Sequence, residues 1–254
     1  MYFKFTKYKL FFQKYGNSDK TILILPGWGN TRDTFKYLIN YFKEFYTIYI
    51  LDYPGFGNSP EINGELNIYD YSYIIKSFMD KNNIKKPIII SHSFGGRISA
   101  ILVGKYKIDV KKLILIDVAG IKRIKPSIIL KQIIYKLLKK ISFFLPCRLK
   151  DKYREYLLYK FGSSDYKDLS LNMRKTFKNI ISEDLKKHYK NINTDTLILW
   201  GDNDIDTPVK DAFLLNKIIK KSDLVIFKNS SHYSYLQNIY RTNIIIKYFI
   251  EKED

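Results

Sequence analysis

One ten-residue stretch decides how this chain folds: Pro87-Ile88-Ile89-Ile90-Ser91-His92-Ser93-Phe94-Gly95-Gly96. Its first half is short, β-branched and apolar on both faces, which is typical of a strand buried in a parallel sheet. The residues from Gly95 to Leu102 have the pattern of a helix. Ser93 therefore lies on a sharp turn between strand and helix, where the two backbones nearly touch and only small neighbours fit.

A serine on such a turn has its hydroxyl lifted above the sheet, close to a helix N-terminus that favours developing negative charge. The pattern is close to Gly-x-Ser-x-Gly, but Ser91 takes the place of the first glycine. Its side chain adds a methylene and a hydroxyl that must find room. Serine and glycine also make ordinary turns, so this stretch alone leaves open whether Ser93 is a nucleophile.

The composition indicates a globular protein. The chain has 254 residues, 46% of them hydrophobic, which suits one large α/β domain or a core with a modest insertion. The single cysteine, Cys147, excludes an intramolecular disulfide and a cysteine-rich metal site, and it fits a reducing compartment. Residues Met1 to Phe12 alternate lysine with aromatics and predict a strand, not a signal peptide. No run approaches the roughly 18 apolar residues of a membrane span, so we expect a soluble or peripheral protein. Together with the reducing compartment that the single cysteine fits, this favours a cytoplasmic location.

The net charge of +19 raises nucleic acid or an anionic membrane as partners. The excess is uneven, because residues 121–190 hold 19 Lys and Arg against 6 Asp and Glu, or +13 of the +19. No nucleic-acid motif accompanies this charge, so we expect no nucleic-acid partner. Residues 121–190 are nevertheless distinct in composition from the rest of the chain.

Strand-like and helix-like stretches alternate, which predicts a doubly wound, mostly parallel sheet of the α/β class. The expected strands are 8–15, 21–25, 46–51, 87–90, 112–116, 196–200 and 224–227, and the expected helices are 31–42, 68–81, 95–102, 208–221 and 233–252. This rhythm is lost over residues 121–190, which are mostly helical in pattern. We therefore predict a core of residues 1–120 and 191–254, with residues 121–190 inserted as a helical cap or lid.

A nucleophilic serine needs a neutral imidazole to accept its proton and a carboxylate to orient that imidazole. The chain has three histidines. His92 belongs to the turn itself, where neighbouring positions point away from the nucleophile, and His188 lies among charged and aromatic residues of the insertion. His232 follows a predicted strand, at the edge of the sheet where strand C-termini gather. His232 is therefore the candidate base.

The candidate carboxylate lies in the turn Trp200-Gly201-Asp202-Asn203-Asp204-Ile205-Asp206-Thr207-Pro208. This turn leaves a buried strand and contains three aspartates. We favour Asp204, the last residue of a Gly-x-x-Asp arrangement. Asp206 could instead cap the helix that begins near Pro208, and all three could serve only turn or capping roles. Asp117, at the end of another strand, is the main rival acid.

Taken together, these motifs resemble the α/β-hydrolase-fold serine hydrolases with a helical cap, and the resemblance spans nearly the whole chain. The order Ser93, Asp204, His232 matches the family's catalytic triad, and the turn at Ser93 resembles its nucleophile elbow. Two more segments agree in order and spacing with family loops: Leu25-Pro26-Gly27-Trp28-Gly29 with the oxyanion-hole loop, and Asp52-Tyr53-Pro54-Gly55-Phe56-Gly57-Asn58-Ser59 with the Asp-x-Pro-Gly-x-Gly-x-Ser loop.

The resemblance implies that backbone N–H groups of Trp28 and Phe94 form the oxyanion hole. Pro26 stands where many family members have histidine, which changes the support of the loop but not its backbone donor. It also implies a serine hydrolase that cleaves a carboxylic ester of a small or lipid-like substrate through an acyl-enzyme on Ser93, with no metal and no organic cofactor. Thioesters, amides, C–C bonds and peptides with a free N-terminus remain alternative substrates, because fold does not fix substrate.

A non-catalytic protein that binds a small molecule in the same pocket is the alternative from a different class. The sequence does not indicate an oligomeric state.

The first part of the predicted insertion has the pattern of an amphipathic helix. Its apolar residues recur at helical spacing, at Leu130, Ile133, Ile134, Leu137, Leu138, Ile141, Phe144 and Leu145. Lysines occupy other positions of the same helix, at Lys131, Lys136, Lys139 and Lys140. We favour a cap helix that buries its apolar side against the mouth of the pocket. The alternative is that this basic helix also makes peripheral contact with an anionic membrane and admits a lipid-like ester.

Overall fold

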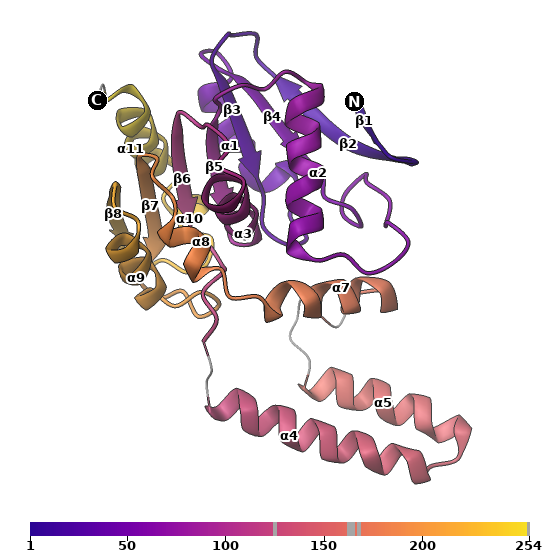
Figure 1. The fold of residues 1–254 in the computed structure, drawn as a ribbon. Helices are drawn as coiled ribbons and strands as arrows, with labels where there is room; N and C mark the ends of the chain where they lie inside the picture. Colours follow the sequence, from indigo (N-terminus) through magenta and orange to yellow (C-terminus); the bar gives the residue numbers. More distant parts are fainter. Residues whose placement is uncertain (124–125, 162–165, 167–168, 253–254) are drawn as a thin grey trace.

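A central sheet of eight strands organises the molecule, in the order β1-β2-β4-β3-β5-β6-β7-β8 (Figure 1). The computed structural model describes residues 1–123, 126–161, 166 and 169–252. The strands are β1 (Tyr2–Phe5), β2 (Tyr8–Tyr15), β3 (Thr21–Leu25), β4 (Thr47–Leu51), β5 (Ile88–His92), β6 (Lys112–Ile116), β7 (Thr196–Gly201) and β8 (Ser222–Phe227). From β4 to β8 all neighbours are parallel, whereas β1, β2 and β4 pair antiparallel. The predicted α/β class and mostly parallel sheet are confirmed.

Helices cover both faces of this sheet, so the central strands are buried on both sides. Ile88 and Ile90 of β5 belong to the core on one face, and Ile89 belongs to the core on the other. The first face is covered by α1 (Lys36–Phe42), α10 (Ser234–Gln237) and α11 (Ile239–Glu251), and the second by α2 (Ile68–Lys81), α3 (Phe94–Ser99), the π-helical turn η2 (Ala100–Lys105), α8 (Lys186–Lys190) and α9 (Lys210–Ile218).

Several predicted elements are divided in the structure. The strand predicted for the first twelve residues is wrong, because β1 and β2 form a hairpin that turns at Thr6, whose φ is 50°. The helix predicted over 31–42 consists of a 3-10 turn, η1 (Arg32–Phe35), followed by α1. The terminal helix predicted over 233–252 is interrupted at Asn238 (φ −129°), between α10 and α11.

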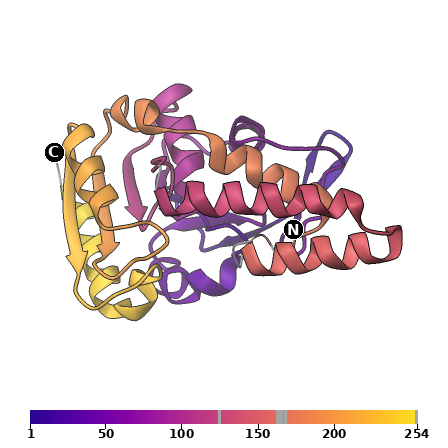
Figure 2. The ribbon, with the colours of Figure 1, turned by 90° about the horizontal axis from the view of Figure 1, so that it is seen from below.

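The segment predicted as an insertion, residues 121–190, contains in its described part α4 (Pro126–Ile141), η3 (Ser142–Phe144), α5 (Cys147–Phe161), α7 (Leu171–Ser182) and α8. Helix α7 lies against the core, whereas α4 and α5 form a hairpin beyond α7, on the side of the molecule where the parallel strands end (Figures 1 and 2). Within the described residues, no helix has both the length and the hydropathy needed to cross a membrane.

The favoured prediction for α4, burial of its apolar side against the pocket mouth, is wrong for most of the stripe. Leu130, Ile133, Ile134, Leu137, Ile141 and Phe144 are exposed, while Leu138 and Leu145 are half-buried; the side chain of Lys131 lies outside the described part. The reason is that α7 takes the place against the core, where its Met173, Thr176 and Ile180 are buried. Asn172 and Thr176 also hydrogen-bond to the backbone of Ile62 and Leu66.

Candidate active site

The turn between β5 and α3 holds Ser93 in an unusual backbone conformation. Its φ of 48° and ψ of −111° are strained for a residue with a side chain. Its N–H donates to the Ile116 carbonyl of β6 at 3.2 Å, and its own carbonyl accepts from Gly96 and Ala119 at 3.0 and 2.9 Å. These bonds fix the strained residue between a strand and a helix.

Two glycines allow the helix to begin this close to the sheet. A Cβ on Gly95 would lie 2.0 Å from the backbone oxygen of Leu25, and one on Gly96 would lie 2.3 Å from Cβ of Val118. Both distances are far below any van der Waals contact. The small residues predicted after Ser93 are therefore required by the packing of α3 on β3 and on the segment after β6.

Ser91, which stands where the pattern has glycine, is accommodated by a partner on the helix. Its side chain is fully buried, and its Oγ lies 2.6 Å from Oγ of Ser99. The Ser99 hydroxyl also lies 3.2 Å from the carbonyl of Gly95. The additional hydroxyl of Ser91 thus joins β5 to α3 and is not directed at Ser93.

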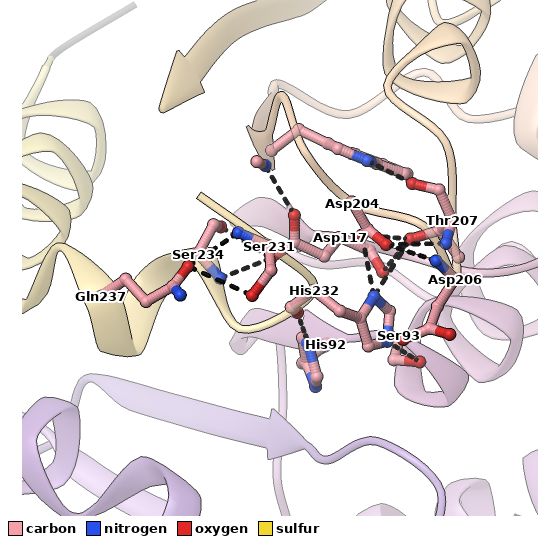
Figure 3. A network of polar contacts seen from close by, with 12 residues as sticks. His92, Ser93, Asp117, Asp204, Asp206, Thr207, Ser231, His232, Ser234 and Gln237 are labelled. Atoms are coloured by element: carbon pink, nitrogen blue, oxygen red, sulfur yellow. Dashed lines mark hydrogen bonds and ion pairs between the residues drawn. The ribbon is translucent and has the colours of Figure 1, made fainter. Parts of the chain in front are cut away.

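Ser93, His232 and Asp204, which come from three different loops, form one hydrogen-bonded chain (Figure 3). His232 Nε2 lies 2.9 Å from Ser93 Oγ, and His232 Nδ1 lies 2.8 Å from Asp204 Oδ2. The side chain of Asp204 is fully buried and that of His232 is 13% exposed. In this arrangement the imidazole can accept the serine proton on one nitrogen while the carboxylate orients the other.

The carboxylate of Asp204 is held by its own turn. Its Oδ1 accepts hydrogen bonds from the backbone N–H groups of Asp206 and Thr207, both at 2.8 Å, and its Oδ2 accepts from the Thr207 hydroxyl at 2.7 Å. The alternative role for Asp206 as a helix cap is wrong, because α9 begins at Lys210 and its N-cap residue, Val209, makes no side-chain capping bond. Asp204 is therefore both the turn-forming residue and the partner of His232.

Proximity of Asp204 and His232 shifts both pKa values toward the ionised pair. Burial acts to raise the pKa of Asp204, but the hydrogen bond and charge of His232, together with the Thr207 donors, outweigh it, and the pKa is lowered. Burial acts to lower the pKa of His232, but the hydrogen bond and charge of Asp204 outweigh it, and the pKa is raised. The carboxylate therefore stays ionised and stabilises an imidazolium beside it.

Asp117, the rival acid, supports the loops around the site and not the imidazole itself. Its carboxylate accepts hydrogen bonds from the Gly201 N–H at 2.9 Å, the Ser234 N–H at 3.1 Å and the Ser234 hydroxyl at 2.6 Å. Burial raises the pKa of Asp117 to about 7, and the Ser234 and Gly201 donors oppose that rise. The residue thus links the end of β6 to the end of β7 and to the loop that follows His232.

His92 is fully buried between the turn and the His232 loop. Its Nε2 lies 2.8 Å from the backbone carbonyl oxygen of His232, so that Nε2 carries the proton and donates it. Burial lowers the pKa of His92 to about 3, which keeps the ring neutral. His92 therefore fixes the backbone of the candidate base, although its side chain points away from the Ser93 hydroxyl (Figure 3).

The two predicted oxyanion donors lie on segments that pack together. The rings of Trp28 and Phe94 are in edge contact, with centroids 5.2 Å apart. Phe94 is the first residue of α3, so its N–H has no partner within that helix. Neither N–H has a hydrogen-bond partner among the described residues.

The surroundings of Trp28 are aromatic. Its ring also contacts Phe56, with centroids 4.8 Å apart, and Phe177 of α7, at 5.2 Å. Phe56 belongs to the loop after β4, which closes through a hydrogen bond from the Asn58 N–H to Asp52 at 2.9 Å. Trp28, the loop after β4 and helix α7 therefore meet through a cluster of aromatic rings.

One group of residues in the described chain has the composition of a metal site, and it overlaps the site above. Ligand atoms of Asp204, Asp206 and His232 lie within 4.8 Å of one another. Both oxygens of Asp204 and Nδ1 of His232 are, however, engaged in the hydrogen bonds just described. These residues are better explained as an acid–base pair than as a set of ligands.

Comparison with known proteins agrees with this geometry. The model of the alpha/beta hydrolase fold family matches residues 20–146, which are half of the 254 residues. The chain belongs to this family.

Two relatives match this chain over nearly the whole length of both proteins. This hydrolase is 26% identical over 264 residues to the pimeloyl-[acyl-carrier protein] methyl ester esterase of Wigglesworthia glossinidia brevipalpis, covering 95% of this chain and 98% of that protein. It is 25% identical over 272 residues to a 2-hydroxy-6-oxononadienedioate/2-hydroxy-6-oxononatrienedioate hydrolase of Escherichia coli (strain K12), covering 96% of this chain and 91% of that protein. The solved structure of MGS-M2, an alpha/beta hydrolase enzyme from a deep-sea metagenome library, superposes with a TM-score of 0.78 at 18% identity, covering 100% of this chain and 98% of that one.

Sequence reasoning missed three residues of this α/β-hydrolase site: Thr207, Asp117 in its supporting role, and His92. Thr207 gives no signal beyond its place in the acid turn. Asp117 directly follows the strand predicted over residues 112–116. This position predicts that Asp117 lies near the site but does not show which groups it hydrogen-bonds. His92 was set aside as a base because it adjoins Ser93, and the sequence carries no signal for its hydrogen bond to the backbone of His232.

Proposed function

We propose that this hydrolase cleaves a carboxylic ester through an acyl-enzyme on Ser93. The observation that carries the proposal is the hydrogen-bonded chain from Asp204 through His232 to Ser93, with distances of 2.8 and 2.9 Å. Two further features support it: the strained turn that presents Ser93, and the unpartnered backbone donors of Trp28 and Phe94. The single cysteine of the chain supports a cytoplasmic setting.

In the first half of the reaction, Ser93 Oγ attacks the acyl carbon and its proton passes to His232 Nε2. The negative charge that develops on the carbonyl oxygen accepts hydrogen bonds from the N–H groups of Trp28 and Phe94. The ester C–O bond then breaks, and the leaving alcohol takes the proton from His232. In the second half, water attacks the acyl group by the same route, which releases the acid and restores Ser93.

Asp204 has two functions in this scheme. It holds the imidazole so that Nε2 faces Ser93, and it stabilises the imidazolium that forms during attack. The lowered pKa of Asp204 supports both functions, because the carboxylate remains charged at neutral pH. Asp117 has no direct function in proton transfer in this scheme, since its oxygens are occupied by Gly201 and Ser234.

Two observations support a substrate class: the aromatic cluster around Trp28 and the names of the relatives. The rings of Trp28, Phe56 and Phe177 suit an apolar acyl chain, and a relative that covers nearly the whole chain is named as a methyl ester esterase. We therefore infer an ester with a small or lipid-like acyl group.

Hydrolysis of p-nitrophenyl esters of increasing acyl length tests this function. We expect release of p-nitrophenol by the wild-type enzyme, and a loss of kcat of at least about a thousandfold in Ser93→Ala and His232→Ala. Asp204→Asn is expected to lose far more activity than Asp117→Asn. Absence of turnover on every ester, with correctly folded protein, would favour a non-catalytic protein that binds a small molecule.

A second candidate is hydrolysis of a C–C bond next to a carbonyl. It is favoured by the relative from Escherichia coli, which is named as a hydrolase of 2-hydroxy-6-oxononadienedioate and 2-hydroxy-6-oxononatrienedioate and which matches over 96% of this chain. Parallel assays on a meta-cleavage dienoate and on p-nitrophenyl esters would separate the two. We expect the ester to have the higher kcat/KM.

A further inference from the structure

The hairpin formed by residues 126–161 exposes a row of large apolar side chains to solvent. We call it the hairpin ridge, and it comprises Leu130, Ile133, Ile134, Leu137, Ile141, Phe143 and Phe144. The first five recur at intervals of three and four residues, so they lie on one face of α4. The last two lie in η3, at the turn between α4 and α5, and are the most exposed, at 68% for Phe143 and 91% for Phe144.

Basic side chains surround this ridge. Residues 126–161 contain nine Lys and Arg against two Asp and Glu, a net charge of +7. Lys136, Lys139 and Lys140 are exposed on α4. On the other side of the turn, Lys150 and Arg154 lie over the ring of Phe143, at 5.0 and 5.8 Å from its centroid. Cations therefore flank the ridge on α4 and at the tip of the hairpin.

The core does not bury the ridge. Helix α7 occupies the place against the core, and Arg97 of α3 fixes its end through hydrogen bonds to the carbonyls of Ile180 and Glu183 at 3.0 and 3.1 Å. The α4–α5 hairpin stands on the far side of α7 (Figures 1 and 2). Soluble proteins rarely expose an apolar surface of this extent unless something binds to it.

We propose that the hairpin ridge docks on a bilayer surface rich in anionic phospholipid. A helix with an apolar face and a lysine-rich polar face lies in the membrane interface with its apolar side chains at the boundary of the acyl chains. Phe143 and Phe144 would enter that boundary first, and the lysines of α4 would bind lipid phosphates. This docking does not depend on catalysis, and it turns the side of the molecule that holds Ser93 toward the lipid.

Cosedimentation with vesicles tests the proposal on the full-length chain carrying Ser93→Ala, so that hydrolysis plays no part. We expect binding to phosphatidylglycerol vesicles at low salt, loss of binding at high salt, and weak binding to phosphatidylcholine vesicles. Replacing Lys136, Lys139 and Lys140 with Gln together is expected to weaken binding about a hundredfold, or about fivefold per lysine. Phe144→Ser is expected to weaken it at least tenfold.

Matched controls come from the opposite edge of the sheet. The control for the lysine variant replaces three exposed lysines that precede β5, β6 and β8, namely Lys85, Lys111 and Lys220. Their replacement with Gln removes the same amount of charge as the triple substitution on α4. Phe45, 59% exposed before β4, matches Phe144. Neither control variant should change vesicle binding by more than about twofold, since neither belongs to the hairpin.

Three outcomes would overturn the proposal. The first is absence of binding to anionic vesicles at low salt. The second is equal weakening by the control and the hairpin substitutions. The third is binding to heparin as tight as binding to anionic vesicles, together with no effect of Phe144→Ser on vesicle binding. That result would show a general polyanion site with no insertion into lipid. Turnover of p-nitrophenyl esters by the wild-type enzyme is measured separately. Failure of membrane docking therefore leaves the proposed ester hydrolysis intact, and failure of ester hydrolysis leaves membrane docking intact.

Discussion

At the scale of single residues, the proposed ester hydrolysis depends on His232, which contacts Ser93, and on the residues that position His232. Asp204 orients His232 from one side, through its ring nitrogen, and His92 holds the same residue from the other, through its backbone carbonyl. The two contacts come from different loops. Each makes a separate prediction about rate or pH dependence.

The acid limb of the pH profile reports the His232 pKa. Attack needs the neutral imidazole, so kcat/KM falls as pH drops through this pKa. Since the Asp204 charge raises the pKa of His232 above its ordinary 6.5, the midpoint of the limb is expected above pH 6.5. Asp204→Asn removes that charge, so its residual activity should have a midpoint at lower pH. An unchanged midpoint in Asp204→Asn would contradict the pairing.

His92→Phe tests whether the hydrogen bond to the His232 carbonyl positions the base. The substitution keeps a ring among the neighbouring aromatic side chains but removes the donor, and we expect kcat to fall about tenfold with little change in KM. His92→Gln retains an N–H at a similar reach and should recover most of the loss. His188→Phe, in α8, is the control. Equal kcat values for His92→Phe and His92→Gln would show that the donor has no role.

Ser91→Gly should leave activity largely intact. The Ser91 hydroxyl pairs with Ser99 and not with Ser93, so its loss is expected to lower the free energy of unfolding by about 1 kcal/mol without slowing the reaction. Urea unfolding and ester hydrolysis, measured on the same preparation, separate the two effects. A large loss of kcat with unchanged stability would reveal a catalytic function for this hydroxyl.

At the scale of elements, the strands were the most predictable part of the fold. The strands expected at 8–15, 21–25 and 112–116 match β2, β3 and β6 at both ends, because each is a short apolar or alternating run. The N-terminal hairpin was missed, because its turn at Thr6 contains neither glycine nor proline, the residues that usually indicate a turn. The exposure of α4 could not be predicted, because an amphipathic pattern shows which face is apolar but not what covers it.

Arg97 links α3, the helix that follows the Ser93 turn, to the end of α7. It is buried and donates to two carbonyls at the end of α7. Arg97→Met leaves both carbonyls without this donor, and we expect the free energy of unfolding to fall by about 2 kcal/mol. Urea titration measures the change, with the exposed Arg241→Met as control. Equal stability of the two variants would contradict this role of Arg97.

At the scale of the whole molecule, the parallel sheet explains why residues so far apart in sequence meet. Ser93, Asp204 and His232 each follow the carboxyl end of a strand, β5, β7 and β8 respectively, and these ends share one edge of the sheet. Their order along the chain could be read from the sequence. Which aspartate reaches the imidazole could not, because Asp117 and Asp204 both lie at that edge and only three-dimensional geometry separates them.

Covalent labelling of Ser93 tests the central claim most directly. The enzyme is treated with a fluorophosphonate, digested and mapped by mass spectrometry, alongside Ser93→Ala and His232→Ala. We expect one adduct on Ser93 in the wild type, no adduct in Ser93→Ala, and strongly slowed labelling in His232→Ala. An unlabelled wild type that is correctly folded, or an adduct on any other serine, would contradict the assignment of Ser93 as the nucleophile.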